Sequence, residues 1–120
     1  MKTSSAKAKG RSLQNTIREQ LKLNFPELEE DDIKCQIMGC SGVDILLSPA
    51  AKKLIPYSIE CKNQEKLNIW ESLKQCEKNS NGLTPVLFFK RNRTDVYAVI
   101  KMEKFMDFIS PNYTNYKSYL

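Results

Sequence analysis

Glycine and proline residues divide the middle of the chain into short apolar runs, and this division constrains the fold more than any other feature. Gly39 and Gly42 separate the first run from the second, Pro49 ends the second, and Pro56 precedes the third. Short runs between such residues are typical of β-strands. Two similar runs follow later, so the sequence predicts strands over residues 33–38, 43–47, 57–62, 84–89 and 96–101.

Helical periodicity marks the segments around these strands. Leu13, Ile17 and Leu21 recur at four-residue spacing behind Ser12, a residue type that caps helices. Pro26 disfavours helical geometry in the residue before it. We therefore expect helices over residues 12–24, 66–79 and 103–109, with a single helical turn over residues 50–54.

The resulting order of elements, α-β-β-β-α-β-β-α, predicts an α+β fold in three layers around a mixed central sheet. The chain has 120 residues, the size of one domain. Residues 1–10 are polar and basic, and we expect a flexible head there. A single domain then spans residues 11–110, and residues 111–120 form a tail that contains Tyr113, Tyr116 and Tyr119.

The chain carries an excess of positive charge, with 19 Lys and Arg against 14 Asp and Glu, which gives a net charge of +5. This excess favours a polyanionic partner such as nucleic acid. No apolar run approaches the ~20 residues of a membrane span, and the basic N-terminal segment lacks the apolar region of a signal peptide. We expect a cytoplasmic protein without membrane contact.

The chain contains no histidine. This absence excludes a Ser-His-Asp triad, a Cys-His protease site and His-ligated zinc or non-haem iron. Four cysteines are present, and their spacing fits no zinc-ribbon pair. In a reducing compartment we expect them to be small buried hydrophobic residues, namely Cys35, Cys40, Cys61 and Cys76.

Two carboxylates and a lysine form the candidate catalytic group. Side chains alternate along a strand, so Glu60 and Lys62 share one face of the third strand, opposite Ile59 and Cys61. If the second and third strands pair as a hairpin, Asp44 lies near Glu60 and Lys62. Two adjacent carboxylates suit Mg²⁺ or Mn²⁺, and a neighbouring lysine can polarise a water or stabilise a phosphate in the transition state. The alternative is an ordinary solvated strand face, on which alternating charges are common.

These segments resemble the PD-(D/E)XK nuclease superfamily. Gly-Val-Asp-Ile-Leu-Leu at residues 42–47 and Ser-Ile-Glu-Cys-Lys at residues 58–62, followed by a helix, match the order of its short motifs. The closest resemblance is to archaeal-type Holliday junction resolvases and related phage nucleases, which begin with a basic Lys-Gly before a helix, as at Lys9-Gly10. The resemblance spans residues 9–101 and implies a restriction-endonuclease-like αβββαβ core.

The resemblance also implies a Mg²⁺- or Mn²⁺-dependent, structure-selective DNA endonuclease that acts as a homodimer. Asp44, Glu60 and the carbonyl group of Cys61 would then bind the metal, and Lys62 would assist the attacking water. Two alternatives stay open: the same site acting on flaps, nicks or DNA ends, and a DNA-binding protein of this fold with weakened catalysis. A basic protein-interaction domain would leave the paired carboxylates unexplained.

Gln14 stands where the resolvases usually carry a glutamate on the first helix. Its side chain points toward the edge of the inward stripe of that helix. An amide in this position can hold a metal water or orient Glu60 without adding charge. The alternative is an amide whose hydrogen bonds are simply satisfied at the core boundary.

Phosphate contacts are expected from the basic head, from a basic turn between the last two strands, and from a polar face of the helix over residues 66–79. The polar face lies opposite an apolar stripe of Ile69, Leu73 and Cys76, with Trp70 beside it. Solvated surface is the alternative interpretation of each group. The residues concerned are Lys7, Lys9 and Arg11 in the basic head, Asn68, Ser72 and Gln75 on the helix face that also carries Asn79, and Lys90, Arg91 and Arg93 in the basic turn.

Overall fold

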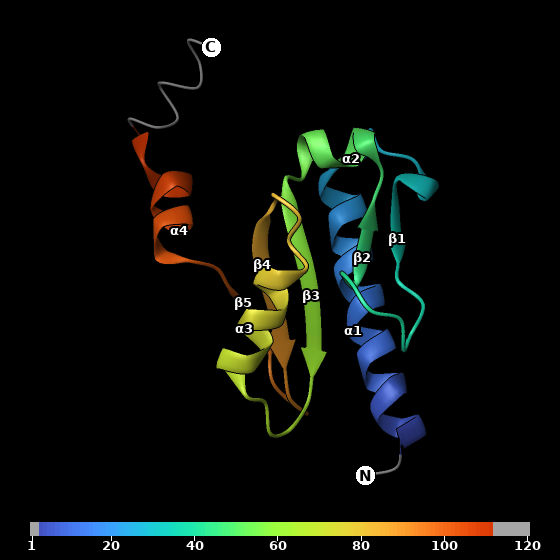
Figure 1. Cartoon of the computed structure of the whole chain (residues 1–120). Coiled ribbons are helices and arrows are strands. Elements are labelled where there is room, and N and C mark those ends of the chain that lie inside the picture. Colours follow the sequence, from blue (N-terminus) through green and yellow to red (C-terminus); the bar gives the residue numbers. More distant parts are fainter. Residues whose placement is uncertain (1–2, 112–120) are drawn as a thin grey trace.

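The computed structural model describes residues 3–111 of the chain (Figure 1). Along the chain its elements are α1 (Thr3–Asn24), the 3₁₀-helix η1 (Glu30–Asp32), β1 (Ile33–Cys35), β2 (Ile45–Leu47), α2 (Pro49–Leu54), β3 (Tyr57–Asn63), α3 (Ile69–Lys78), β4 (Thr84–Lys90), β5 (Tyr97–Val99) and α4 (Met102–Ile109). Within these residues, no helix is long and apolar enough to cross a membrane.

The strands form two small sheets. β1 and β2 pair antiparallel, while β3 pairs parallel with β4, and β4 pairs antiparallel with β5. α1 packs against β1 and β3, and α3 packs against β3 and β4 from the other side (Figure 1). The predicted α+β class is confirmed, and the three-stranded sheet is mixed as expected.

β3 lies between the two helices, which explains its burial. Four consecutive residues, 58–61, are buried. Ile59 and Cys61 join the core with the apolar stripe of α1, whereas Ser58 and Glu60 contact the end of α3. A strand that is covered on both faces loses the simple alternation of buried and exposed residues.

The predicted hairpin between the second and third strands is reduced to local contacts around Asp44. β1 and β2 are each 3 residues long, which is shorter than predicted. β2 and β3 belong to different sheets, and the N–H group of Asp44 donates a 3.0 Å hydrogen bond to Ile59 O. Asp44 therefore lies at the free edge of β3, close to the residues with which the sequence grouped it.

α1 begins at Thr3, so the prediction that this helix starts at residue 12 is wrong, and the described part of the predicted head belongs to the helix. Alanine and lysine are good helix formers, and no proline interrupts them here. The helix also approaches a loop closely at Gly10, where an added Cβ would lie 3.1 Å from Met38 Cε. The tail predicted over residues 111–120 lies, apart from residue 111, outside the described residues.

The prediction that the cysteines are buried is correct for two of them and wrong for the others. Cys61 and Cys76 are buried, Cys35 is half-buried and Cys40 is exposed. Burial raises the thiol pKa of Cys76 to about 12 and also raises the pKa of Cys61, so both thiols stay neutral. Cys40 is exposed because it follows Gly39 in the loop between the two short strands β1 and β2.

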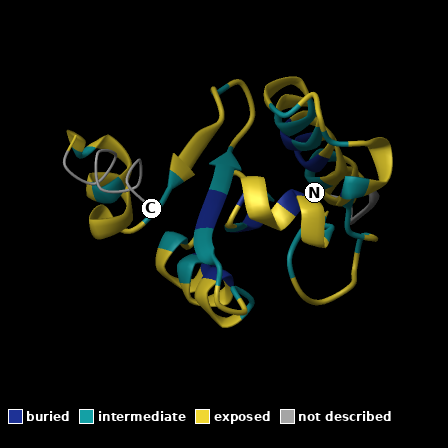
Figure 2. Cartoon of the chain, turned by 90° about the horizontal axis from the view of Figure 1, so that it is seen from above, coloured by how far each residue is buried: buried dark blue, intermediate teal, exposed yellow. Residues whose placement is uncertain are grey.

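α4 stands at the edge of the molecule and is exposed along most of its length (Figure 2). Its apolar side chains Met102, Phe105, Met106, Phe108 and Ile109 are between 49% and 73% exposed. Phe105 and Phe108 also form one wall of an apolar cavity of about 350 Å³, whose floor is β3, β4 and β5. The apolar face of this helix is thus only partly covered.

Candidate functional site

Asp44 is held at the free edge of β3 by four hydrogen bonds, one of which its backbone oxygen accepts from Gln36 N–H at 2.8 Å. Its N–H group donates to Ile59 O at 3.0 Å, its Oδ2 accepts from Cys61 N–H at 2.6 Å, and its Oδ1 accepts from Gln14 Nε2 at 3.2 Å. Gly42, with a φ of +102°, turns the chain shortly before Asp44 in a conformation that favours glycine. The position of the carboxylate is therefore determined by α1 and β3 together.

Gln14 lies on the inward side of α1 and is only 4% exposed. Its Nε2 group donates to the Asp44 carboxylate, so Asp44 is the group that the amide orients. Its Oε1 atom is buried and has no hydrogen-bond partner among residues 3–111. The alternative interpretation, in which all hydrogen bonds of the Gln14 amide are made within the protein, therefore applies to its nitrogen but not to its oxygen.

The side chain of Glu60 lies on the face of β3 toward the end of α3, opposite the face that packs against α1. It is 4% exposed. Asn79 Nδ2 donates a 2.9 Å hydrogen bond to Glu60 Oε1. Burial and the neighbouring Asp44 raise the pKa of Glu60 to about 7, while Asn79 and Lys62 act in the opposite direction. A cation beside the two carboxylates would offset their repulsion and stabilise the charged form of Glu60.

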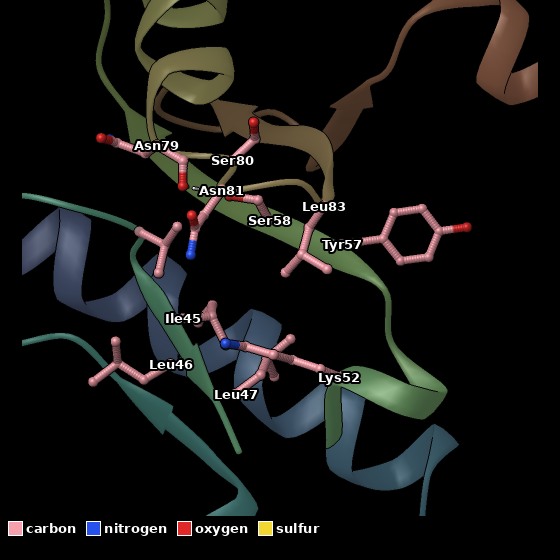
Figure 3. Close-up of a pocket in the computed structure, with 11 residues that line it drawn as sticks. Ile45, Leu46, Leu47, Lys52, Tyr57, Ser58, Asn79, Ser80, Asn81 and Leu83 are labelled. Atoms are coloured by element: carbon pink, nitrogen blue, oxygen red, sulfur yellow. Dashed lines mark hydrogen bonds between the residues drawn. The ribbon is translucent and has the colours of Figure 1, made fainter. Parts of the chain in front are cut away.

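Asn79 holds Glu60 in place, a role that the sequence analysis did not assign to it. It follows the last residue of α3, and its side chain turns inward to Glu60 while its backbone oxygen accepts from Ser58 Oγ at 3.3 Å. Figure 3 shows Asn79 and Ser58 beside a cavity of about 210 Å³, with the residues of β2 on the other side. In the sequence, Asn79 is an uncharged amide at the end of a predicted helix, and such residues are too common to indicate a functional site.

A second cavity, of about 200 Å³, lies between α1 and the carboxyl end of β3. Gln14, Asp44, Cys61 and Lys62 line it, and so does Asn63, which the sequence analysis did not single out. Asn63 Nδ2 donates to a backbone carbonyl of α1 at 3.3 Å. Its Oδ1 is buried and lacks a hydrogen-bond partner in the described part of the chain. Lys7 of the basic head lines it too, so five of the predicted site residues meet at one cavity.

The donor atoms around Asp44 suit a hydrated Mg²⁺ or Mn²⁺ ion. Residues 3–111 contain no cluster of three or more His, Cys, Asp or Glu side chains placed for a metal, but Mg²⁺ is commonly held by one or two carboxylates and keeps several waters. The N–H and C=O groups of a strand residue point to the same edge, so the Cys61 carbonyl points toward Asp44, as its N–H group does. The unpaired Gln14 Oε1 adds a neutral oxygen. Asp44, Glu60 and the Cys61 carbonyl thus fit this ion better than they fit zinc, which prefers nitrogen and sulfur ligands.

The basic head and the basic turn lie at the same end of the molecule. The three residues of the basic head occupy the first half of α1. The basic turn joins β4 to β5 as predicted, and Asn63 of β3 pairs in register with Lys90. Because Asn63 also contacts α1, both basic groups border the end of β3 that carries Lys62 (Figure 1).

The polar face predicted on α3 is only partly solvated. Asn68 caps the N-terminus of α3 through a 3.1 Å hydrogen bond, and Gln75 is exposed. Ser72 is 5% exposed and donates to Asn68 O at 3.0 Å, so the expectation that it faces solvent is wrong. Trp70, expected beside the core, is 78% exposed. The small side chains of Ser72 and Cys76 allow α3 to approach the sheet closely, and this rotates its buried stripe away from the predicted one.

Comparison of the chain with protein-family models, with curated proteins and with solved structures gives no match. A function for this chain is therefore inferred from the residues and geometry of the site.

Proposed function

We propose that the chain is a metal-dependent deoxyribonuclease with a restriction-endonuclease-like core. The single observation that carries this proposal is the position of Asp44, which Gln14 and Cys61 N–H hold at the free edge of β3. Glu60 and Lys62 lie on that same strand. Apart from the short helices η1 and α2, the order α1, β1, β2, β3, α3, β4 is that of the αβββαβ core that the resemblance implied.

Each part of the site has a defined task in phosphodiester hydrolysis. A Mg²⁺ or Mn²⁺ ion held by the two carboxylates and the Cys61 carbonyl would supply positive charge to the phosphate and to the attacking water. Gln14 and Asn79 orient the two carboxylates through hydrogen bonds. Lys62 offsets the negative charge that develops on the phosphate in the transition state.

DNA is the proposed substrate because positive charge surrounds this site. The basic head and the basic turn border the end of β3 next to Lys62, and the exposed Asn68 and Gln75 of α3 add neutral contacts. Cations of this kind bind phosphates without regard to sequence. Contacts of this kind follow the backbone and shape of DNA rather than its base sequence, and a branched DNA such as a Holliday junction is the substrate that the sequence resemblance implies. Flaps, nicks and DNA ends are the alternative substrates of the same chemistry.

We further infer that the active species is a homodimer formed through α4. The apolar side chains of α4, at 49–73% exposure, present on the order of 500 Å² by themselves, which already lies toward the upper end of the about 300–600 Å² that the largest apolar patch of a monomeric protein covers. The apolar cavity beside α4 extends this surface. An apolar helix and an apolar groove on the same chain are self-complementary, as a two-fold interface requires. Two active sites are also what symmetric cleavage of a branched DNA needs.

Incubation with a panel of labelled DNAs tests the proposed function. The panel contains a four-way junction, a flap, a nicked duplex and a linear duplex, each with Mg²⁺ or with EDTA. We expect Mg²⁺-dependent cleavage of the branched substrates, and Lys62→Gln should lower its rate by about 10²–10³. Lys53→Gln is the matched control, because it removes an exposed positive charge on α2. An absence of cleavage on every substrate, or a Lys62→Gln variant as fast as wild type, would contradict the assignment.

A further inference from the structure

Two buried amide oxygens beside the same cavity lack hydrogen-bond partners among residues 3–111. They are Gln14 Oε1 and Asn63 Oδ1. Both residues line the cavity between α1 and β3, together with Asp44, Cys61 and Lys62. Buried acceptors are nearly always paired in folded proteins, so two unpaired ones at one cavity indicate a ligand that brings donors to it.

The orientation of both amides is determined by their nitrogen atoms. Gln14 Nε2 donates to the Asp44 carboxylate, and Asn63 Nδ2 donates to Lys9 O. Rotating either amide by half a turn would place its oxygen against another oxygen, which is repulsive. The unpaired atoms are therefore acceptors and cannot be exchanged for donors.

The charge and size of the cavity indicate which ligand fits. Lys7 and Lys62 bring two ammonium groups to the cavity. Cys61 N–H is already used by Asp44, and both amide nitrogens are used as well, so the acceptors that remain are a carboxylate and two neutral oxygens. This set suits a hard cation with its waters of hydration. One water takes up about 30 Å³ of liquid volume, so a cavity of about 200 Å³ admits an ion with several waters.

We propose that Asn63 is a positioning residue for the divalent cation, with Asn63 Oδ1 and Gln14 Oε1 accepting hydrogen bonds from the waters of an ion held by Asp44. This inference rests on the metal site of the proposed function. It adds to that site a residue on the α1 side of β3, one position beyond the Glu60–Lys62 motif. Asn63 also links β3 to α1 through its bond to Lys9 O.

A purely structural role for Asn63 predicts a different response to substitution. The link to α1 needs the amide nitrogen, whereas the cation needs the oxygen. Asn63→Asp keeps an oxygen, adds negative charge and loses the donor to Lys9 O, so it separates the two roles. Asn24→Asp is the matched control, because Asn24 Nδ2 likewise donates to a backbone carbonyl, that of Gln20 at 2.7 Å, at the other end of α1.

Binding of Mn²⁺ to the full chain without DNA, followed by the EPR signal of the free ion, tests this role. Asn63→Ala should weaken binding by about 10–100-fold, as loss of an outer partner at a metal site does. Asn63→Asp should tighten binding several-fold, and Asn24→Asp should leave it unchanged. Thermal unfolding without metal shows that each variant is folded.

The outcomes separate this inference from the proposed function. If Asn63→Ala and Asn63→Asp bind Mn²⁺ like wild type while Asp44→Asn does not bind it, the role of Asn63 is refuted and the metal site stands. A lysine ammonium that pairs with the oxygen would give this result. If wild type binds no Mn²⁺, both the inference and the metal site are refuted.

A measurement on the unaltered chain covers the case in which the Asn63 variants do not fold. Mn²⁺ broadens NMR signals steeply with proximity, so the side-chain NH₂ signals of Gln14 and Asn63 should vanish at Mn²⁺ ratios that leave the Asn24 signal sharp. Equal broadening at Asn63 and Asn24 would overturn the proposal.

Discussion

Replacing Asp44 separates its structural role from its chemical role. The carboxylate accepts from Cys61 N–H at 2.6 Å and from Gln14 Nε2 at 3.2 Å. Asp44→Ala leaves both donors without an acceptor, whereas Asp44→Asn keeps one side-chain oxygen for Cys61. In the asparagine variant the Gln14 amide can rotate, so that its unpaired Oε1 accepts from the new NH₂ group.

The two variants should therefore differ in stability. A hydrogen bond to a charged group contributes about 1.5–3 kcal/mol, and an unsatisfied buried donor costs about 1–3 kcal/mol. Asp44 is half-buried and lies beside a cavity, so the lower ends of these ranges apply. Asp44→Ala should lower the free energy of unfolding by about 2–4 kcal/mol, and Tm by roughly 4 °C for each kcal/mol. Asp44→Asn should lower it by less than about 1 kcal/mol.

Urea unfolding at neutral pH without metal, followed by circular dichroism, measures this difference. The same preparations should both fail to cleave a four-way junction, because each variant removes the negative charge that binds the cation. An alanine variant as stable as wild type would refute the hydrogen bonds as the feature that fixes Asp44. An asparagine variant that cleaves at the wild-type rate would refute the role of Asp44 in metal binding.

Three further outcomes are expected. Replacing the three basic residues of the basic turn by glutamines should weaken DNA binding and reduce its salt dependence by up to ~0.9 logarithmic units per lost phosphate contact. The control in this salt series is the same change at the two lysines of α2. An unchanged slope of binding constant against salt concentration would place the DNA elsewhere. Lys22 and, secondarily, Arg18 lower the pKa of Glu30 to about 2, so its contribution to stability is present above its ordinary pKa and disappears as the pH falls toward 2. Urea unfolding across this pH range should show wild type and Glu30→Gln converging at the acidic end, and a constant difference would argue against the ion pairs. Phe108→Glu should convert the dimer into a monomer in analytical ultracentrifugation, and a monomeric wild type at micromolar concentration would disprove the α4 interface.

The fold class was predictable because chain breakers act locally. Gly39, Gly42, Pro49 and Pro56 lie between the strands as expected, and the five strands lie within or close to the predicted ranges. Pairing was less predictable because it depends on contacts between distant segments. β2 and β3 meet around Asp44 without joining one sheet, so a full hairpin was the wrong expectation even though Asp44 lies where that hairpin would have put it.

The early start of α1 was missed because residues 3–10 lack the apolar stripe by which packed helices are recognised. Tertiary contacts accompany this part of the helix instead, including the bond from Asn63 to Lys9 O and the close approach of Met38 to Gly10. Local sequence patterns do not predict such contacts, because the contacts join segments that are far apart in the chain.

Within the site, charged residues were easier to predict than amides. Strand alternation, an assumed pairing of the second and third strands, and the family resemblance together singled out Asp44, Lys62 and Gln14, which line one cavity. Asn63 and Asn79 carry no charge and belong to no motif, and their importance follows from which atoms they leave paired or unpaired. That information exists only once the chain is folded.

The dependence of the cleavage rate on Mg²⁺ concentration tests the central claim most directly, namely that DNA cleavage requires a divalent cation held by Asp44 and Glu60. Single-turnover rates on a four-way junction should be negligible in EDTA for wild type, and should rise with Mg²⁺ to a plateau. Glu60→Gln should stay inactive at every concentration, while Asp31→Asn, which neutralises an exposed carboxylate of η1, should follow wild type. A wild-type rate independent of Mg²⁺, or a Glu60→Gln variant that reaches the wild-type plateau with wild-type Mg²⁺ dependence, would contradict the account.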